Sequence, residues 1–279
     1  MKKISRRSFM AAAAVSVAAL ALTACGGSAS SAASSVASSA ASSEAVSSAA
    51  AADLTTVEAG KLTMATNAAF PPYEMTTDAG EFEGIDVDTA KAIAEKLGLE
   101  LQIDDMDFDA ALLSVQQGKA DIVMAGVTVT DERKAVMDFS DSYATGIQSI
   151  IVPNDSKIAS PDDLAGKKIG TQRGTTGYIY CSDDFGDENV VAYDNGLTAV
   201  QALNNGQVDA VVIDNAPAKE FVAANPGLVI LETSYAEEDY AIGMAKGNTA
   251  LEDAVNTALE ELKADGTLQS IVDKYITAE

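Results

Sequence analysis

The chain has 279 residues, of which 42 are acidic and 18 basic, and a formal net charge of −24 at pH 7. Proteins that bind nucleic acid rely on basic patches, so this charge excludes DNA and RNA as partners and instead favours solubility. The chain has no histidine. That absence excludes Ser-His-Asp and Cys-His catalysis and removes the commonest ligand of transition metals.

The N-terminus has the pattern of an export signal. A basic start, residues 1–7, precedes an apolar run from Phe9 to Leu22, which is long enough for a signal peptide but short for a membrane span. The following Leu-Thr-Ala-Cys, ending at Cys25, resembles a bacterial lipobox. We therefore expect residues 1–24 to be a signal peptide and a lipidated Cys25 to anchor the protein to the membrane surface.

The export route stays open at this point. Ser-Arg-Arg-Ser-Phe at residues 5–9 resembles a twin-arginine signal, but the same arginines could simply supply the positive charge of an ordinary leader. Residues 26–52 are almost entirely Gly, Ser and Ala and cannot bury enough apolar surface to fold. We expect residues 25–56 to form a tether with a root-mean-square reach of roughly 30 Å.

The rest of the chain alternates strand-like and helix-like segments, which predicts parallel sheets flanked by helices. Asp86 is expected to cap a helix that stops at Gly98. The first group of predicted elements comprises strands at 62–66, 99–103 and 121–126 and helices at 86–97 and 109–117. The second comprises strands at 147–152, 167–171, 189–193, 208–213 and 228–231 and helices at 175–181, 197–204 and 216–224. Two long helices, at 249–264 and 268–275, close the chain.

Small residues, hydroxyls and one arginine gather after the third strand, between Ala125 and Tyr143. Gly126 lets a ligand approach the backbone, Thr128 offers an N–H and a hydroxyl, and Arg133 offers a planar set of donors suited to a carboxylate. The alternative is a plain helix start, in which Thr130 caps and Arg133 is solvated.

Several motifs resemble the family-3 extracellular solute-binding proteins of polar amino-acid ABC importers, which include glutamine- and histidine-binding members. They are Thr-Asn-Ala-Ala-Phe-Pro-Pro-Tyr at 66–73, Gly-Ile-Asp-Val-Asp at 84–88, Asp-Phe-Asp-Ala at 107–110, the segment 125–143, Gly-Thr-Gln-Arg-Gly-Thr-Thr-Gly at 170–177 and Val-Asp-Ala-Val-Val-Ile-Asp at 208–214. The resemblance extends over residues 62–276.

This resemblance implies a two-lobed, periplasmic-binding-protein-like α/β fold of type II, in which each lobe is a mostly parallel sheet flanked by helices. Residues 57–146 and 240–279 would form lobe 1, and residues 147–239 lobe 2. Two hinge strands, near 145–148 and 237–241, would connect the lobes, and the C-terminal helices would return to lobe 1.

The resemblance also assigns the ligand contacts. Arg133, with the backbone N–H of Thr176 at a helix start, would bind the ligand's carboxylate, and Asp214 its ammonium. Phe70 and Phe108 would enclose its side chain. The further candidates are Asn67, Gly126 and Thr128, and then Tyr73 and Gln172. Core packing of the two phenylalanines, and helix capping by Asp214, are the alternatives.

The predicted function is a lipid-anchored, monomeric, extracytoplasmic receptor that delivers an amino acid to an ABC permease. Relatives for basic ligands carry an aspartate at the position of Asn67, so a neutral polar ligand is favoured, with glutamine first. An enzyme such as a dehydratase and the ligand-binding subunit of a sensor are the alternatives. With Asn67 and Ile213 facing the ligand side chain, the sequence offers no acid for catalysis there.

No cofactor or metal is expected, because the acidic clusters at 104–109 and 183–188 lack the spacing of a calcium loop. Cys181 is expected to be a small buried residue or a free thiol.

Overall fold

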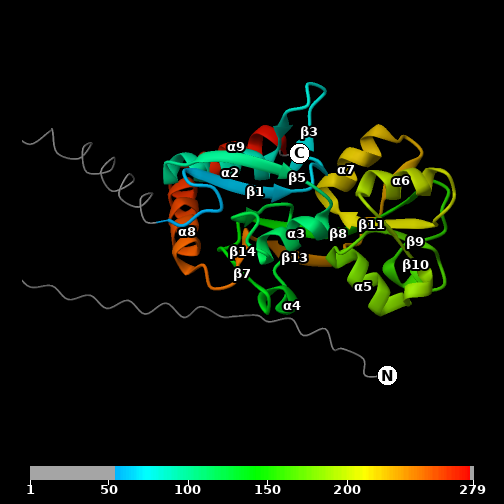
Figure 1. Cartoon of the computed structure of the whole chain (residues 1–279). Helices are drawn as coiled ribbons and strands as arrows, with labels where there is room; N and C mark the ends of the chain where they lie inside the picture. The colour runs from blue at the N-terminus through cyan, green and yellow to red at the C-terminus, as the bar shows by residue number, and fades with distance from the viewer. Residues whose placement is uncertain (1–53, 277–279) are drawn as a thin grey trace, which may run out of the picture. The chain divides into compact units, whose positions relative to one another are not determined.

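A computed structural model describes residues 54–276, which form two sheet-containing lobes of mixed α/β structure (Figure 1). This confirms the predicted fold class. The predicted signal peptide, Cys25 and nearly all of the tether lie outside the described residues.

The elements up to the strand that leaves the first lobe are β1 (Lys61–Thr66), β2 (Ala69–Phe70), β3 (Glu74–Thr76), β4 (Phe82–Glu83), α2 (Ile85–Leu97), β5 (Glu100–Asp105), α3 (Phe108–Gln116), β6 (Ile122–Val123), α4 (Asp131–Lys134), β7 (Met137–Phe139) and β8 (Ala144–Pro153). The remaining elements are the 3₁₀ turn η1 (Pro161–Leu164), β9 (Ile169–Gln172), α5 (Thr176–Phe185), the 3₁₀ turn η2 (Asp187–Asn189), β10 (Val190–Tyr193), α6 (Gly196–Asn204), β11 (Ala210–Asp214), α7 (Asn215–Ala224), β12 (Leu228–Ile230), β13 (Ala236–Tyr240), β14 (Gly243–Ala245), α8 (Thr249–Ala264) and α9 (Thr267–Tyr275).

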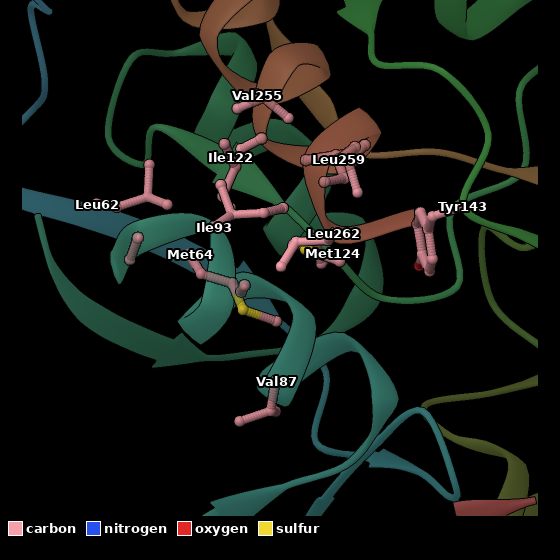
Figure 2. Close-up of a cluster of buried hydrophobic side chains, with 14 of the residues drawn as sticks. Leu62, Met64, Val87, Ile93, Ile122, Met124, Tyr143, Val255, Leu259 and Leu262 are labelled. Atoms are coloured by element: carbon pink, nitrogen blue, oxygen red, sulfur yellow. The ribbon is translucent and has the colours of Figure 1, made fainter. Parts of the chain in front are cut away.

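The first sheet has the strand order β5-β1-β6-β14-β7. Its strand β1 runs parallel to β5 and β6, whereas β14 runs antiparallel to β6 and β7. Because β14 follows the whole second lobe in sequence, the chain returns to the first lobe through it. Helix α8 then packs its buried residues into the same core as β1 and α2, and Figure 2 shows side chains from these elements meeting in one cluster.

The second sheet has the order β10-β9-β11-β8-β12, and β13 also pairs with β8. Strand β9 runs parallel to β10 and β11, as the alternation of strands and helices predicts. The long strand β8 runs antiparallel to β11, β12 and β13. Parallel strands put their carboxyl ends at one edge, so the residues after β9 and β11 lie close together.

The segments predicted to connect the lobes form an antiparallel ribbon. Within it, Thr145 pairs with Asp239 and Gln148 pairs with Ala236. The ribbon continues into the isolated bridge between Thr128 and Tyr240. The strand that leaves the first lobe and the strand that re-enters it are therefore joined by backbone hydrogen bonds.

One local prediction is wrong. Asp86 does not cap α2, because the N-cap is Gly84 and Asp86 is fully buried in the first turn. Its Oδ2 accepts a hydrogen bond from the backbone N–H of Gly126 at 3.0 Å. A tertiary contact 40 residues away has overridden the local capping preference.

Several short elements have no counterpart in the sequence analysis: the three-stranded sheet β2-β3-β4 and the strands β7 and β14. Each is too short to show a period that distinguishes it from a loop. The strand predicted at 121–126 is also shorter than expected, because only Ile122 and Val123 form β6. Beyond Val123 the backbone turns into the segment that carries Gly126 and Thr128.

Among residues 54–276 there is no helix that could cross a membrane. The same part of the chain has no cluster of three metal-ligating His, Cys, Asp or Glu side chains. Cys181 is a buried, free cysteine in the second lobe.

We expect Leu259→Ala to lower the free energy of unfolding by about 2–5 kcal/mol, because Leu259 of α8 is fully buried in the first lobe's core. Denaturant unfolding measures this change. Leu113→Ala on α3 is the control, since Leu113 is 49% exposed and its truncation should change stability by about 0.5 kcal/mol or less. Equal effects of the two substitutions would show that α8 does not stabilise the lobe as described.

Candidate functional site

A cavity of about 440 Å³, including some space open to solvent, lies where the two lobes meet. This is the size of a small-molecule site. Its lining comes from both sheets: Asn67, Phe70, Glu74, Phe108, Ala125, Gly126, Thr128, Arg133, Gln148, Gln172, Thr175, Thr176, Val212, Ile213, Asp214 and Tyr240. All the ligand residues predicted from the sequence are in this set except Tyr73. The structure places Tyr73 behind Phe70, where the two rings stack at 5.9 Å between centroids.

Arg133 is the cation of this cavity. The hydroxyl of Thr130 accepts a hydrogen bond from the Arg133 N–H and so caps the short helix α4. The alternative was a plain helix start with a solvated arginine. Arg133 is only 9% exposed, so its side chain is not solvated in this way. Its Nη1 donates to the carbonyl oxygen of Thr128 at 2.8 Å, and its Nη2 donates to that of Gly174, in the second lobe, at 3.1 Å.

Burial lowers the pKa of Arg133, and Glu238 opposes this change electrostatically. A guanidinium stays charged even so, and its five N–H donors exceed the two used here. The ring of Phe108 lies 5.4 Å from the guanidinium carbon and covers part of it. Arg133 is therefore a fixed, buried cation with donors left for an anionic ligand group.

Thr128 belongs to a hydrogen-bonded group that sequence reasoning missed. Its hydroxyl donates to Oε2 of Glu238 at 3.1 Å, and the side-chain amide of Gln148 donates to the same oxygen at 3.0 Å. The hydroxyl oxygens of Thr128 and Thr176 lie 3.4 Å apart. Since the Thr128 proton points to Glu238, Thr128 presents an oxygen lone pair, not a donor, to Thr176.

Asp214 ends β11 and is 2% exposed. It caps α7 by accepting from the Ala216 N–H at 3.2 Å, and its other oxygen accepts from the Ile147 N–H at 2.7 Å. Burial raises the pKa of Asp214 to about 6, although the Tyr240 hydroxyl and these N–H groups oppose the shift. Asp214 therefore both caps α7 and lines the cavity, and the sequence allowed these two roles together.

Aromatic rings form a wall of the cavity. Phe70 and Phe108 both line it, and Tyr73 joins Phe70 to Tyr240 through a further edge contact at 5.4 Å. Gly126 has φ 55°, and a Cβ there would lie 2.9 Å from the Phe70 ring and 3.1 Å from Tyr240. Only glycine allows the backbone to approach both rings in this conformation.

Asn67 and Gln172 join the two lobes at the cavity. The Gln172 side-chain amide donates to Oδ1 of Asn67 at 2.9 Å, and Nδ2 of Asn67 donates to the carbonyl oxygen of Met106 at 2.8 Å. Asn67 follows β1 and Gln172 ends β9, so the contact links the carboxyl ends of strands from different sheets. Together with the contact between Arg133 and Gly174, it holds the lobes against each other.

Glu74 is the most informative residue that sequence reasoning missed. It lies on β3, lines the cavity and is fully buried, and neither of its carboxyl oxygens has a hydrogen-bond partner among the described residues. Burial, and next the neighbouring Asp86, raise the pKa of Glu74 well above its usual value. The only sequence signal was one acid after Pro-Pro-Tyr, and its burial depends on the pairing of β2, β3 and β4.

Comparison with known proteins agrees with this architecture. Residues 62–278 match the bacterial extracellular solute-binding proteins, family 3. A probable histidine-binding protein of Neisseria gonorrhoeae is 34% identical over 275 residues, which cover 96% of this chain and 95% of that protein.

Solved structures give the same result. An ancestral arginine-binding protein bound to glutamine is 42% identical, with a TM-score of 0.75 over 78% of this chain and 99% of that one. Its structure bound to arginine gives 43% identity and a TM-score of 0.74 over 78% and 98% of the two chains. The match to the family spans well over half of the sequence and relatives of known structure share its fold, so this chain belongs to the bacterial extracellular solute-binding proteins, family 3.

Proposed function

We propose that this protein binds an amino acid in the cavity between its lobes and delivers it to an ABC permease. The observation that carries the proposal is the pairing of one buried cation, Arg133, with one buried carboxyl, Asp214, in a single cavity. A free amino acid carries both complementary charges, and a buried charge needs such a partner. The relatives named as amino-acid-binding proteins support the same ligand class.

In this proposal Arg133 and the N-terminus of α5 at Thr176 bind the ligand carboxylate, and Asp214 binds its ammonium. Gly126 and Thr128 supply further backbone contacts, and Phe70 and Phe108 enclose the side chain. Residues 57–146 and 240–279 act as one lobe and residues 147–239 as the other. The ligand favours closure because only the closed form satisfies both of its charges.

We also propose that the mature protein is a monomer that is held outside the cytoplasm by lipid on Cys25. The lipobox-like sequence and the Gly/Ser/Ala-rich tether support this, together with the extracellular character of the family. The protein would perform no chemistry. The sequence predicts no acid beside the ligand side chain, but Glu74 lines the cavity. What supports the absence of chemistry is the kinship with relatives named as binding proteins.

Two classes of ligand side chain fit the cavity, and a separate observation supports each of them. The uncharged amides of Asn67 and Gln172, which bond to each other, make this part of the cavity lining neutral and polar, and this suits a ligand such as glutamine, the candidate from the sequence. The buried carboxyl of Glu74 suits a basic ligand, because a cation would satisfy oxygens that have no other partner. The solved relatives bound to arginine and to glutamine support both classes on one fold. The acid at position 74 makes the basic class the stronger candidate.

Arg133→Ala should weaken amino-acid binding by about 2–5 kcal/mol, or at least about 30-fold, because the ligand carboxylate loses its buried partner. A thermal-shift screen of the purified protein against amino acids, followed by calorimetry, measures the loss. Arg173→Ala is the matched control, since the side chain of Arg173 is 56% exposed at the rim of the cleft. Undiminished affinity in Arg133→Ala would refute the carboxylate site, and conversion of the ligand, followed by NMR, would refute a purely binding role.

Affinity should fall as the pH drops below about 6, by up to about tenfold per pH unit, because the ligand ammonium pairs only with ionised Asp214. Calorimetric titrations of a neutral amino acid between about pH 5 and 8 measure this effect. Asp214→Asn should bind weakly at every pH and lose this dependence. Without ligand the sign reverses: the raised pKa of Asp214 makes protonation stabilise the folded state as the pH falls through about 6. An affinity that is constant across this range would contradict the role of Asp214.

Glu74→Gln should weaken arginine binding by about 1.5–3 kcal/mol, the range for hydrogen bonds to charged groups, and change glutamine binding much less. The reason is that the substitution removes the carboxyl while keeping its size. Calorimetry with both ligands on the wild type and the variant gives the comparison. Equal losses for the two amino acids would mean that Glu74 supports the cavity without choosing the ligand.

A further inference from the structure

Behind the cavity two carboxyl groups are buried together, and no lysine or arginine of residues 54–276 is recorded in hydrogen-bond contact with them. Glu74 of β3 and Asp86 of α2 are both fully buried. The backbone brings them together, because the Asp86 N–H donates to the carbonyl oxygen of Tyr73 at 2.9 Å. Only Glu74 lines the cavity, whereas Asp86 lies behind Gly126 and accepts its N–H.

Most of the oxygens of this pair lack a donor. Both oxygens of Glu74 and Oδ1 of Asp86 have no hydrogen-bond partner among the described residues. Two ionised carboxylates that face each other are acceptors only and repel one another. A single proton between them turns one into a donor and removes one of the two buried charges.

Burial of the pair favours that proton. Of the titratable groups around it, Asp105 at the end of β5 also raises the pKa of Glu74, whereas the hydroxyl of Tyr143 before β8 opposes the upward shift of Asp86. Tyr73, in the preceding loop, is a phenol whose own pKa is raised by burial and by nearby acids. Burial raises the pKa of Asp86 to about 6, and burial together with Asp86 raises that of Glu74 well above its usual value. Such a pair loses its protons in two separate steps, the second of them far above the first.

We propose that Glu74 and Asp86 share one proton in the ligand-free protein and that a cationic ligand side chain at Glu74 expels it to solvent. The second half rests on the proposed amino-acid-binding function. On binding, the O–H bond of the pair breaks, the proton passes to water or buffer, and the ligand cation takes over its charge. A neutral side chain such as that of glutamine leaves the proton in place.

The shared proton can be tested without any ligand. Infrared spectra of the full chain at neutral pH should contain a band of a protonated carboxyl that disappears in Glu74→Gln, while circular dichroism verifies that the variant is folded. Glu81→Gln is the control, because Glu81 is an exposed acid in the same hairpin. Absence of the band in the wild type, or its persistence in folded Glu74→Gln, overturns the shared proton.

Proton release is tested by calorimetry with arginine and glutamine in two buffers of different ionisation enthalpy. At about pH 7.5, above the pKa of about 6 of Asp214, that residue contributes no proton. Arginine should release about one proton, and its affinity should rise with pH, whereas glutamine should release none. Glu74→Gln should abolish the buffer dependence, and Glu81→Gln should keep it.

Each contrary result has its own meaning. Arginine that binds with the same enthalpy in both buffers, or does not bind while glutamine does, overturns the release step and leaves the proposed function standing. If no amino acid binds, the proposed function and the release step both fail, and the infrared result alone decides whether the proton is shared.

Discussion

The cavity depends on how the positive charge of one buried side chain, that of Arg133, is compensated. Arg133 is held largely out of water, and two of its N–H groups donate to carbonyl oxygens, at Thr128 in its own lobe and at Gly174 in the other. Carbonyl dipoles solvate a guanidinium only in part, so a buried arginine favours an anion beside it. Because one of its acceptors lies across the cleft, the side chain proposed to bind the ligand carboxylate also links the two lobes.

The same site also has an excess of buried acids. Glu74 and Asp214 line the cavity and Asp86 is buried behind it, and each has a raised pKa because burial disfavours its charge. One ligand ammonium compensates only one of these carboxyls. Of the two that remain, Glu74 and Asp86, the proposed shared proton or a second cation on the ligand would compensate one. The preference of the protein for a ligand side chain would therefore depend on the protonation state of Glu74 and Asp86.

The sequence predicted those features that depend on local pattern. Long amphipathic helices such as α8 were found at their bounds, and the residues after β6, β9 and β11 lie at the cavity because parallel strands end at a common edge. The residues it missed become buried through pairing between distant segments. Glu238 reaches Thr128 and Gln148 only because β13 pairs with β8, and Glu74 is buried through a hairpin of very short strands.

Asp86 is a residue for which the sequence predicted a local role and the structure shows a contact with a distant segment. An acid in the first turn of a helix is a common capping signal, but here its acceptor oxygen holds the N–H of Gly126, a residue that lines the cavity. This hydrogen bond fixes the turn on which the ligand would lie.

The amides of Asn67 and Gln172 bond to each other where the two lobes meet, and this bears on which ligand the cavity prefers. The missing charge at Asn67 favours a neutral ligand only if this side chain faces the ligand, yet it is occupied by Gln172 and by the Met106 carbonyl. Both amides thus serve the contact between the lobes. In the proposed function the charge that would face a ligand side chain is that of Glu74 on β3, which lines the cavity. The electrostatic character of the cavity is set by the sum of the buried groups around it, so a neutral residue at one position does not make the whole site neutral.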